Sequence, residues 1–581
     1  MRRTSALTLS LTLSLCLAMQ AGAQDATPQP EQGTGLTDQR LVTARDYMVA
    51  AANPLAVAAG RDVLAAGGSA ADAAVAVQLM LNLVEPQSSG IGGGAFALYW
   101  DASEGRLSTL DGRETAPRAA TPEYWLGADG EPLGFWDAVT GGRSVGVPGT
   151  LALLDHLHAR HGRTPWADLF APAIATAEDG FEISPRLADS IEGAMERDLA
   201  LFPATAAYFF NEDGTPRAAG ETLTNPDFAR TLRLIAAEGI GPFYEGAIAG
   251  DIVAAVRTQT NPGILTLEDL SGYEVIERPP VCVLYRAHEV CGMGPPSSGA
   301  LTVGQMLGML DGFDLAALPE AAAWHHYVEA ARLAYADRGK YMADSDFVNM
   351  PTEGLIDPEY LAARAALIDP RASMGEAQPG MPEWDETRLW SPDMSLDRPG
   401  TSHFVIVDRH GDMISMTTTI ETGFGSRVMT GGFLLNNELT DFSFRPTGDE
   451  GPVANRVEGG KRPRSSMAPT IVLTEGRPSI LIGSPGGSRI INYVAGSLVR
   501  MIDFGMDPLA AISAGHVVNR NGRTELEAGT AVEALAEALT GLGHETASSD
   551  LNSGLHVITI APDGTLTGAA DPRREGAVMG E

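Results

Sequence analysis

The stretch GTSHFVIVDRHGDMISMTTT, residues 400–419, contains two strand-like runs on either side of a turn centred on His410. Gly411 supplies the positive φ that a three-residue hairpin loop needs. Counting back from the turn of this antiparallel hairpin, Thr401 faces Thr419 at the open end. Directly opposed residues place their Cβ atoms about 5 Å apart, near enough for a hydrogen bond between two hydroxyls. The pattern predicts a hairpin that can hold a nucleophilic hydroxyl, although ordinary sheets also contain facing threonines.

The composition limits the classes of partner. The 581 residues are enough for two or three domains or for one large layered α/β body. Asp and Glu outnumber Lys and Arg by 74 to 40, which gives a net charge of −34. This charge argues against a nucleic acid or an anionic membrane as a partner. We interpret it as a contribution to solubility.

The N-terminus has the pattern of a secretory signal. Residues 1–23 combine Arg2 and Arg3, an apolar run over 5–19 and the small-residue site AGA at 21–23. Residues 24–41, rich in Pro, Gly, Gln and Asp, follow as a predicted flexible leader. An uncleaved membrane anchor is the alternative, but serines and threonines interrupt the apolar run, and no later run is long enough to cross a bilayer. We therefore expect export, to a periplasm or out of the cell, and no membrane contact once the signal is removed.

Cysteines and histidines give few candidate metal ligands. Cys282 and Cys291 lie in the two arms of a predicted short hairpin, and a disulfide between them is expected in an oxidising compartment. His325 and His326, followed by Glu329, do not make a complete ligand set on the predicted helix 320–337. We interpret that helix as a packing element and predict no metal.

Helix signals dominate the first 400 residues and strand signals the rest. A capping residue followed by proline, typical of a helix start, occurs at 53–54, 164–165, 184–185 and 225–226, and Ser69 begins an alanine-rich helix that reaches about Val84. Strand-like runs occur at 95–100, 106–110 and 281–285, and then at 402–408, 413–419, 432–435, 470–473, 479–482 and 555–560. Two sheets with helices on both sides fit this order. Residues 368–398 are expected to form a long exposed loop, or a linker between domains.

Five further motifs accompany the hairpin. They are SSGIGGG (88–94), LDGRETAP (110–117), LLNNELTDF (434–442), KRPRSSMAPT (461–470) and GSPGGSR (483–489). In this order, from about Met48 to Pro572, they resemble the gamma-glutamyltransferase family of N-terminal-nucleophile amidohydrolases. The resemblance implies an α+β fold, a four-layer αββα sandwich. It also implies self-cleavage between Gly400 and Thr401, which yields a heterodimer of a large, mostly helical subunit (42–400) and a small, strand-rich catalytic subunit (401–581).

The implied chemistry uses one residue as both nucleophile and base. The Thr401 hydroxyl attacks the Gly400 carbonyl, which no side chain obstructs, and water then hydrolyses the resulting ester. The new α-amine has a pKa of about 7.7 to 8 and can accept the hydroxyl proton in later turnovers. The implied substrates are glutathione or other gamma-glutamyl compounds, and the acyl group passes to water or to an amino acid or peptide amine. No metal or organic cofactor is expected.

The resemblance also assigns the groups around the nucleophile. The backbone N–H groups of Gly486 and Gly487 would hold the oxyanion. These glycines lie in a predicted tight turn at 484–488. A phosphate-binding loop is the alternative interpretation of this turn, but no Lys-Ser/Thr pair follows the glycines. A glutamyl head carries an α-carboxylate and an α-ammonium, and their expected partners are Arg113, Ser465 and Ser466 for the carboxylate, and Glu438 and Asp441 for the ammonium.

Two departures from the family pattern bear on specificity. Glu421 stands two residues after Thr419, where well-known members carry Asn, and it adds a third negative charge beside Glu438 and Asp441. Residues 442–460 are shorter than in members with a lid loop and contain no tyrosine, so we expect an open cleft. Two alternatives stay open: a cephalosporin or glutaryl-type acylase on the same scaffold, and an uncleaved homologue that only binds.

Overall fold

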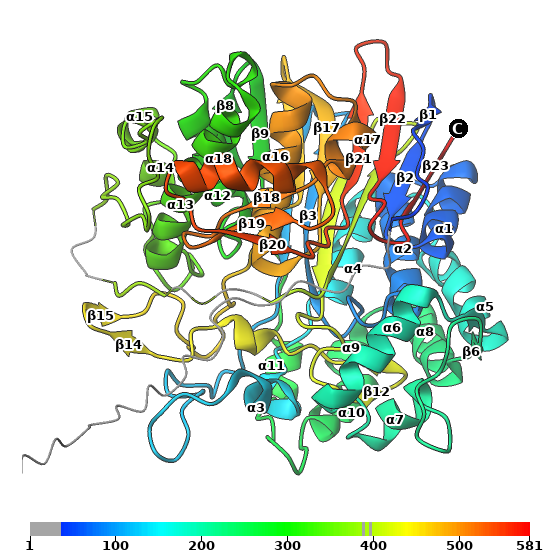
Figure 1. Cartoon of the computed structure of the whole chain (residues 1–581). Helices are drawn as coiled ribbons and strands as arrows, with labels where there is room; N and C mark the ends of the chain where they lie inside the picture. Colours follow the sequence, from blue (N-terminus) through cyan, green and yellow to red (C-terminus); the bar gives the residue numbers. More distant parts are fainter. Residues whose placement is uncertain (1–35, 386–389, 394, 396–397) are drawn as a thin grey trace, which may run out of the picture.

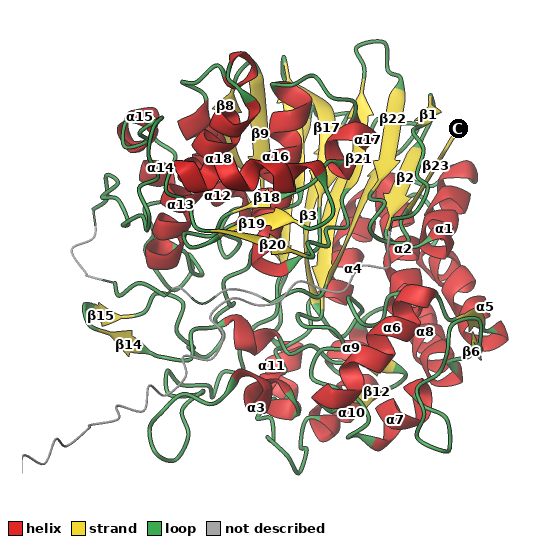
Figure 2. Ribbon diagram, viewed as in Figure 1, coloured by secondary structure: helices red, strands yellow, loops and turns green. Residues whose placement is uncertain are grey.

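Two face-to-face sheets with helices on their outer sides form the body of the protein (Figures 1 and 2). The computed structural model describes residues 36–385, 390–393, 395 and 398–581. The predicted signal peptide and most of the predicted leader therefore lie outside the described residues. Within the described part of the chain, no helix combines the length and apolarity that a bilayer crossing requires.

The first sheet has seven antiparallel strands that come from distant parts of the chain. Their order is β1 (Val42–Ala44), β22 (Leu566–Ala570), β21 (His556–Ile560), β17 (Arg477–Gly483), β16 (Thr470–Thr474), β9 (His288–Gly292) and β8 (Val281–Tyr285). The second sheet, also antiparallel, has the order β23 (Ala577–Gly580), β2 (Met48–Ala51), β10 (Thr401–Val407), β11 (Met413–Thr419), β3 (Gly94–Asp101), β4 (Arg106–Gly112) and β7 (Ile276–Arg278). Each sheet contains strands from both sides of residue 400, so the two parts interleave in one body.

Separate groups of helices cover the two outer faces. Those against the second sheet are α1 (Pro54–Ala65), α2 (Ala70–Val84) and α4 (Thr150–His161), and outside them pack α5 (Ala171–Asp179) and α8 (Pro226–Glu238). Those on the side of the first sheet are α12 (Gly299–Leu310), α13 (Glu320–Tyr341), α16 (Ile490–Ile502) and α17 (Pro508–Ser513). Together with the two sheets they make the predicted αββα layers.

Shorter elements surround this sandwich. The helices are α3 (Phe135–Val139), α6 (Pro185–Ala194), α7 (Pro203–Phe209), α9 (Gly241–Tyr244), α10 (Ala247–Ala255), α11 (Leu267–Ser271), α14 (Thr352–Leu355), α15 (Pro358–Ala365) and α18 (Ala536–Gly541). Small strand groups are β5 (Phe181–Glu182) with β6 (Thr222–Leu223), β12 (Met429–Thr430) with β13 (Phe433–Leu434), β14 (Thr447–Gly448) with β15 (Gly451–Pro452), and β18 (Val517–Val518), β19 (Thr524–Glu527) and β20 (Thr546–Ser549).

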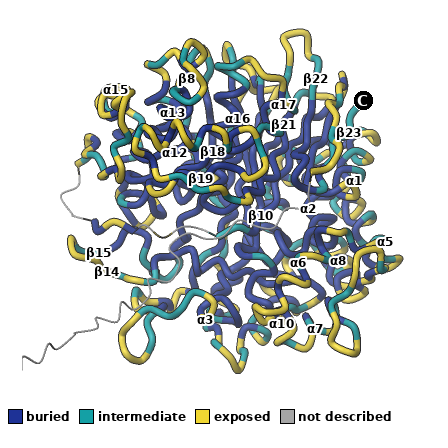
Figure 3. Tube along the Cα trace, viewed as in Figure 1, coloured by how far each residue is buried: buried dark blue, intermediate teal, exposed yellow. Residues whose placement is uncertain are grey.

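Strands of the second sheet are apolar on both faces because both faces are covered. In β10, Phe404 and Ile406 pack into the core beside α1 and α2, whereas Val405 and Val407 pack into the core between the sheets. This alternation follows from the two-residue period of a strand. Full burial of one such side chain stabilises the fold by about 1.5–3 kcal/mol. Figure 3 shows the buried chain concentrated in these layers.

Most predicted helix starts are confirmed. Asn53 caps α1, Ser69 caps α2 in a capping box with Asp72, and the side chains at the other two confirmed starts cap α6 and α8. The start predicted at 164–165 is wrong as an α-helix. There the chain forms the 3₁₀ helix η2 (Trp166–Phe170), whose N-cap position is Pro165, and the Thr164 N–H instead donates to the Asp72 carboxylate, at 3.0 Å.

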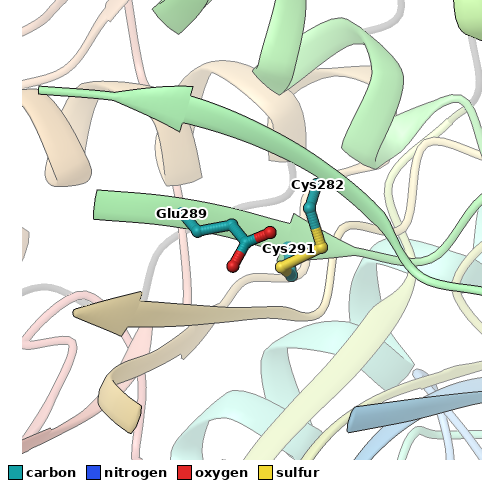
Figure 4. Close-up of side chains that lie close together, drawn as sticks. All are labelled: Cys282, Glu289 and Cys291. Carbon is teal, nitrogen blue, oxygen red and sulfur yellow. A yellow bond between two sulfur atoms is a disulfide. The ribbon is translucent and has the colours of Figure 1, made fainter. Parts of the chain in front are cut away.

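The predicted disulfide is present between β8 and β9. Cys282 faces Cys291 across the two strands, and their sulfur atoms are bonded (Figure 4). The long loop predicted at 368–398 contains no helix or named strand in its described residues. The helix predicted over 320–337 is α13, which extends to Tyr341 and is buried over most of its length.

Candidate active site

Thr401 and Thr419 face each other at the open end of the β10–β11 hairpin, as predicted. At the closed end, the Asp408 N–H donates to the Asp412 carbonyl at 3.0 Å, and Gly411 has a φ of 85°. This turn fixes the register of the whole hairpin. The Thr401 Oγ1 atom consequently lies 3.5 Å from the Thr419 Oγ1 atom.

The Thr419 hydroxyl connects the two groups that would react. It donates to the Gly400 carbonyl oxygen at 2.7 Å and accepts the Glu421 backbone N–H at 2.8 Å. The donated hydrogen bond withdraws electron density from the carbonyl that precedes Thr401. A Cβ atom at position 400 would lie only 2.0 Å from the Glu421 carbonyl oxygen, so a residue with a side chain does not fit there without a shift of the backbone.

A small cavity opens beside Thr401 and collects nearly all the predicted site residues. Its lining includes Thr401, Thr419, Arg113, Glu421, Glu438, Asp441, Ser465, Ser466 and Gly487. Of the two predicted oxyanion donors, Gly487 lines this cavity and Gly486 does not. The sequence interpretation missed three lining residues, Arg398, Met467 and Ile490. Met467 and Ile490 could have been found as residues within or directly after the quoted motifs, and Arg398 as a close neighbour of the predicted cleavage point.

Arg113, which directly follows β4, forms a buried ion-pair cluster with two acidic residues. It makes a short contact to Glu438, and its Nη2 atom lies 2.6 Å from Asp441 Oδ2. The same Nη2 atom donates to the Arg464 carbonyl at 2.9 Å. Both acids come from the 3₁₀ helix η5 (Glu438–Asp441), which places their carboxylates on one side of the guanidinium. The expected partners of the two ends of a glutamyl head are thus already paired with each other.

Burial makes several carboxyl groups of this site hard to ionise. It raises the pKa of Glu114, the neighbour of Arg113, to about 8. Burial is also the main cause that raises the pKa of Glu421 well above its usual range, and the nearby charge of Asp441 adds to it. For Glu438 burial outweighs the opposing attraction of Arg113, so its pKa is raised too. Burial therefore disfavours the ionised form of all three of these carboxyl groups.

The two serines and the glycine turn complete the wall of the cavity. The Ser466 Oγ atom accepts a hydrogen bond from the Arg338 guanidinium at 2.7 Å, and the Ser465 Oγ atom accepts the Met467 N–H at 3.1 Å. Each hydroxyl can still use its own hydrogen as a donor. Gly486 and Gly487 have positive φ values of 135° and 58° and lead into the 3₁₀ helix η6 (Gly487–Arg489), which confirms the predicted tight turn.

Comparison with known proteins identifies the family of the chain. The sequence model of the family described as gamma-glutamyltranspeptidase matches residues 56–581. The chain belongs to this family. Its membership agrees with the motif order and with the hairpin that carries Thr401.

Relatives of this gamma-glutamyltranspeptidase family member carry two kinds of name. The chain is 36% identical to the glutathione hydrolase proenzyme of Bacillus subtilis (strain 168), over 100% of this chain and 99% of the relative. It is 35% identical to the acylase ACY 1 proenzyme of Pseudomonas sp. (strain V22), over 94% and 96%. The crystal structure of cephalosporin acylase from Bacillus halodurans matches with a TM-score of 0.83 and 29% identity, covering 95% of this chain and 99% of that one. These matches confirm the fold and support a hydrolase or transferase.

Two clusters outside the cavity bring metal-ligand types together. Cys282, Glu289 and Cys291 form one, but its two sulfur atoms are bonded to each other and offer no thiolate (Figure 4). In the other cluster the His325 Nδ1 atom lies 2.7 Å from the Nε2 atom of His544, a residue that the sequence interpretation did not associate with the helix.

The nitrogen and oxygen atoms of this second cluster that could bind a metal already take part in hydrogen bonds. The His325 Nε2 atom is bonded to the Asp369 carbonyl, and Glu329 accepts bonds from Ser373 and Met374. The guanidinium of Arg332 pairs with Glu329 at 3.1 Å. The cluster therefore fits a structural role between α13 and the segment around His544, in line with the interpretation of this helix as a packing element.

Proposed function

We propose that this family member is a self-processing gamma-glutamyl hydrolase and acyltransferase with Thr401 as its nucleophile. The observation that supports this proposal most directly is the Thr419 hydroxyl, which lies beside the Thr401 hydroxyl and donates to the Gly400 carbonyl. Family membership supports the reaction class. We also propose export, from the signal-like pattern of residues 1–23.

Self-cleavage is the first proposed reaction. The Thr401 oxygen attacks the Gly400 carbonyl carbon, the C–N bond breaks, and the acyl group moves from nitrogen to oxygen; water then hydrolyses the ester. The Thr419 hydroxyl stabilises the negative charge that develops on the carbonyl oxygen. The products are a large subunit ending at Gly400 and a small subunit beginning at Thr401, which remain associated as a heterodimer because their strands share both sheets.

Turnover of substrate repeats the attack with the new terminus. The α-amine of Thr401 takes the proton from its hydroxyl, and the oxygen attacks the amide carbonyl of the donor. The C–N bond of the donor then breaks, and its amine leaves with the proton that the α-ammonium returns, so that the acyl group remains as an ester on Thr401. The backbone N–H groups of Gly486 and Gly487 are the proposed oxyanion donors. Water or the amine of an amino acid or peptide then takes the acyl group from the ester. All these steps use protein groups, so the proposal includes no cofactor.

A glutamyl head can replace the internal ion pairs of the cavity without leaving a charge unpaired. Its carboxylate would take the Arg113 guanidinium, assisted by Ser465 and Ser466, and its ammonium would take the carboxylates of Glu438 and Asp441. Breaking a buried ion pair on one side only is strongly unfavourable, whereas this exchange substitutes one pair for another. A zwitterionic acyl group therefore fits better than one with a carboxylate alone.

The test compares processing and donor specificity in the purified protein. Thr401→Ala should remain a single chain and hydrolyse no gamma-glutamyl-4-nitroanilide, whereas wild type should show a new N-terminus at Thr401. Ser402→Ala is a matched control, because the buried Ser402 hydroxyl has no hydrogen-bond partner among the described residues. Normal processing or activity in Thr401→Ala would refute the proposed nucleophile.

A glutaryl-type acylase is the second candidate, and the raised pKa of Glu421 and of Glu438 favours it. A carboxyl group whose ionised form is disfavoured by burial depends less on an ammonium partner. The ratio of kcat/KM for glutamyl and glutaryl 4-nitroanilides separates the two candidates. A ratio well above one at pH 7 supports the gamma-glutamyl enzyme, and a ratio below one supports the acylase.

A further inference from the structure

Arg398, two residues before the proposed cleavage point, occupies an aromatic surface at the edge of the cavity. Its guanidinium carbon lies 4.1 Å from the centre of the Phe135 ring and 5.4 Å from that of Trp136. The same residue lines the cavity together with Thr401 and Glu421. We call Phe135 and Trp136, the first two residues of α3, the aromatic platform.

A series of ring contacts links the aromatic platform to the 3₁₀ helix η5 of the candidate active site. Phe135 and Trp136 pack edge to face with ring centres 5.2 Å apart, and Phe135 stacks in parallel with Phe444 at 6.3 Å. Phe444 stacks in turn on Trp125 at 5.0 Å, and the Trp125 Nε1–H donates to the Leu439 carbonyl in η5. The platform is thereby held in a fixed position relative to Glu438 and Asp441.

The platform lies at the outer side of the cavity. Trp136 is 37% exposed, whereas Arg113 and Glu438 are almost completely buried. In the proposed reaction the charged glutamyl head binds those buried groups, so the amine part of a substrate, which has to enter and leave, extends toward the exposed side. The guanidinium carbons of Arg197 and Arg427 already lie 4.8 Å and 5.8 Å from the centre of the Trp136 ring. The face of Phe135 is the one that Arg398 covers most closely, and an aromatic face of this kind favours a flat cation.

We propose that the aromatic platform is a subsite for the amine part of the substrate and that it prefers a guanidinium group. Before cleavage, Arg398 occupies this subsite as part of the chain. Cleavage at Gly400 removes its covalent link to Thr401, and an acceptor or leaving group with an arginine side chain takes its place. This inference rests on the proposed acyl transfer, but the two can fail separately.

The step that this subsite would affect is the transfer of the acyl group from Thr401 to the acceptor. The acceptor amine forms an amide bond with the acyl carbon, the ester bond to Thr401 Oγ1 breaks, and the proton of the amine passes through the Thr401 α-amine to the released oxygen. A guanidinium on the platform places the attacking amine and does not take part in the bond changes. Its effect should therefore appear in the kcat/KM for the acceptor.

The experiment uses the processed two-chain enzyme with gamma-glutamyl-4-nitroanilide as donor. Arginine amide and citrulline amide serve as acceptors, because they have the same chain length and differ in side-chain charge. Wild type should prefer arginine amide about two- to five-fold, the ratio that one partly exposed cation–π contact provides. Phe135→Leu and Trp136→Leu should each bring this ratio toward one.

The control is Trp166→Leu, because Trp166 lies in η2 and packs against Phe170, away from the cavity lining. This variant should keep the wild-type ratio. A wild-type ratio near one, or an unchanged ratio in both platform variants, would overturn the inference. A preference for arginine amide that appears only in the Arg398→Ala variant would also overturn the inference, because it would mean that Arg398 still covers the platform after cleavage. Hydrolysis of the donor in the absence of an acceptor tests the proposed function alone. A failure of the proposed function can therefore be distinguished from a failure of the subsite inference.

Discussion

Replacing Thr419 by valine should slow the cleavage between Gly400 and Thr401, at some cost to the stability of the fold. Valine keeps the shape of the side chain but removes the hydroxyl that donates to the Gly400 carbonyl at 2.7 Å. Loss of one donor to a developing oxyanion costs about 2.7–4 kcal/mol, which corresponds to a rate about 100- to 1000-fold lower. The unpaired carbonyl and the Glu421 N–H add a cost of about 1–3 kcal/mol each to the folded state.

The assay follows the precursor over time by denaturing electrophoresis and confirms the cleavage point by mass spectrometry. Thr418→Val is the matched control, because the neighbouring Thr418 hydroxyl is equally buried and has no hydrogen-bond partner within the described chain. It should be processed at the wild-type rate. If Thr419→Val is processed within about three-fold of Thr418→Val, the Thr419 hydroxyl does not stabilise the oxyanion, since one lost donor predicts a much larger effect.

Two further predictions concern stability. Burial raises the pKa of Glu114 to about 8, whereas a glutamate in the unfolded chain titrates near 4.3, so wild-type stability should fall as the pH rises between these values. In urea unfolding, Glu114→Gln should therefore gain stability relative to wild type by up to about 1.4 kcal/mol per pH unit between pH 5 and 8, and a constant difference would contradict this. Replacing Cys282 and Cys291, nine residues apart, by serine should cost about 2–3 kcal/mol; reductant should destabilise wild type equally and leave the double variant unchanged.

The hairpin could be predicted from the sequence because local rules determine it. A glycine turn and a two-residue period fix which residues face each other, and the pairing of Thr401 with Thr419 follows from the turn alone. The neighbours of the hairpin are different. β2 pairs with β10 on one side and with β23 on the other, although these strands lie hundreds of residues apart. A short strand carries no local sequence signal that identifies its partner strands. The pairing of β2 with β10 and β23 could therefore be learned only from the structure.

The sequence could predict that these residues lie close together, but not how they pair with one another. The family resemblance placed Arg113, Glu438 and Asp441 in one site, and in the structure they lie in contact. The sequence interpretation paired these residues with the two ends of a substrate. In the structure they pair with one another, since a buried guanidinium needs carboxylates when no substrate supplies one. His544 was missed because it lies 219 residues from His325 and belongs to no recognisable spacing.

The position of Thr401 explains how a cut chain could keep its nucleophile in place. Thr401 is the first residue of β10, which is a central strand: it pairs with β11 from Thr401 onward and with β2 from Phe404 onward. Scission of the preceding peptide bond removes none of these backbone pairings. The new terminus is held by its ladder bonds to β11 and by the side chains that pack on both faces of the strand. The amine released by the proposed cleavage would therefore stay within reach of the hydroxyl of the same residue, as a base for that hydroxyl requires.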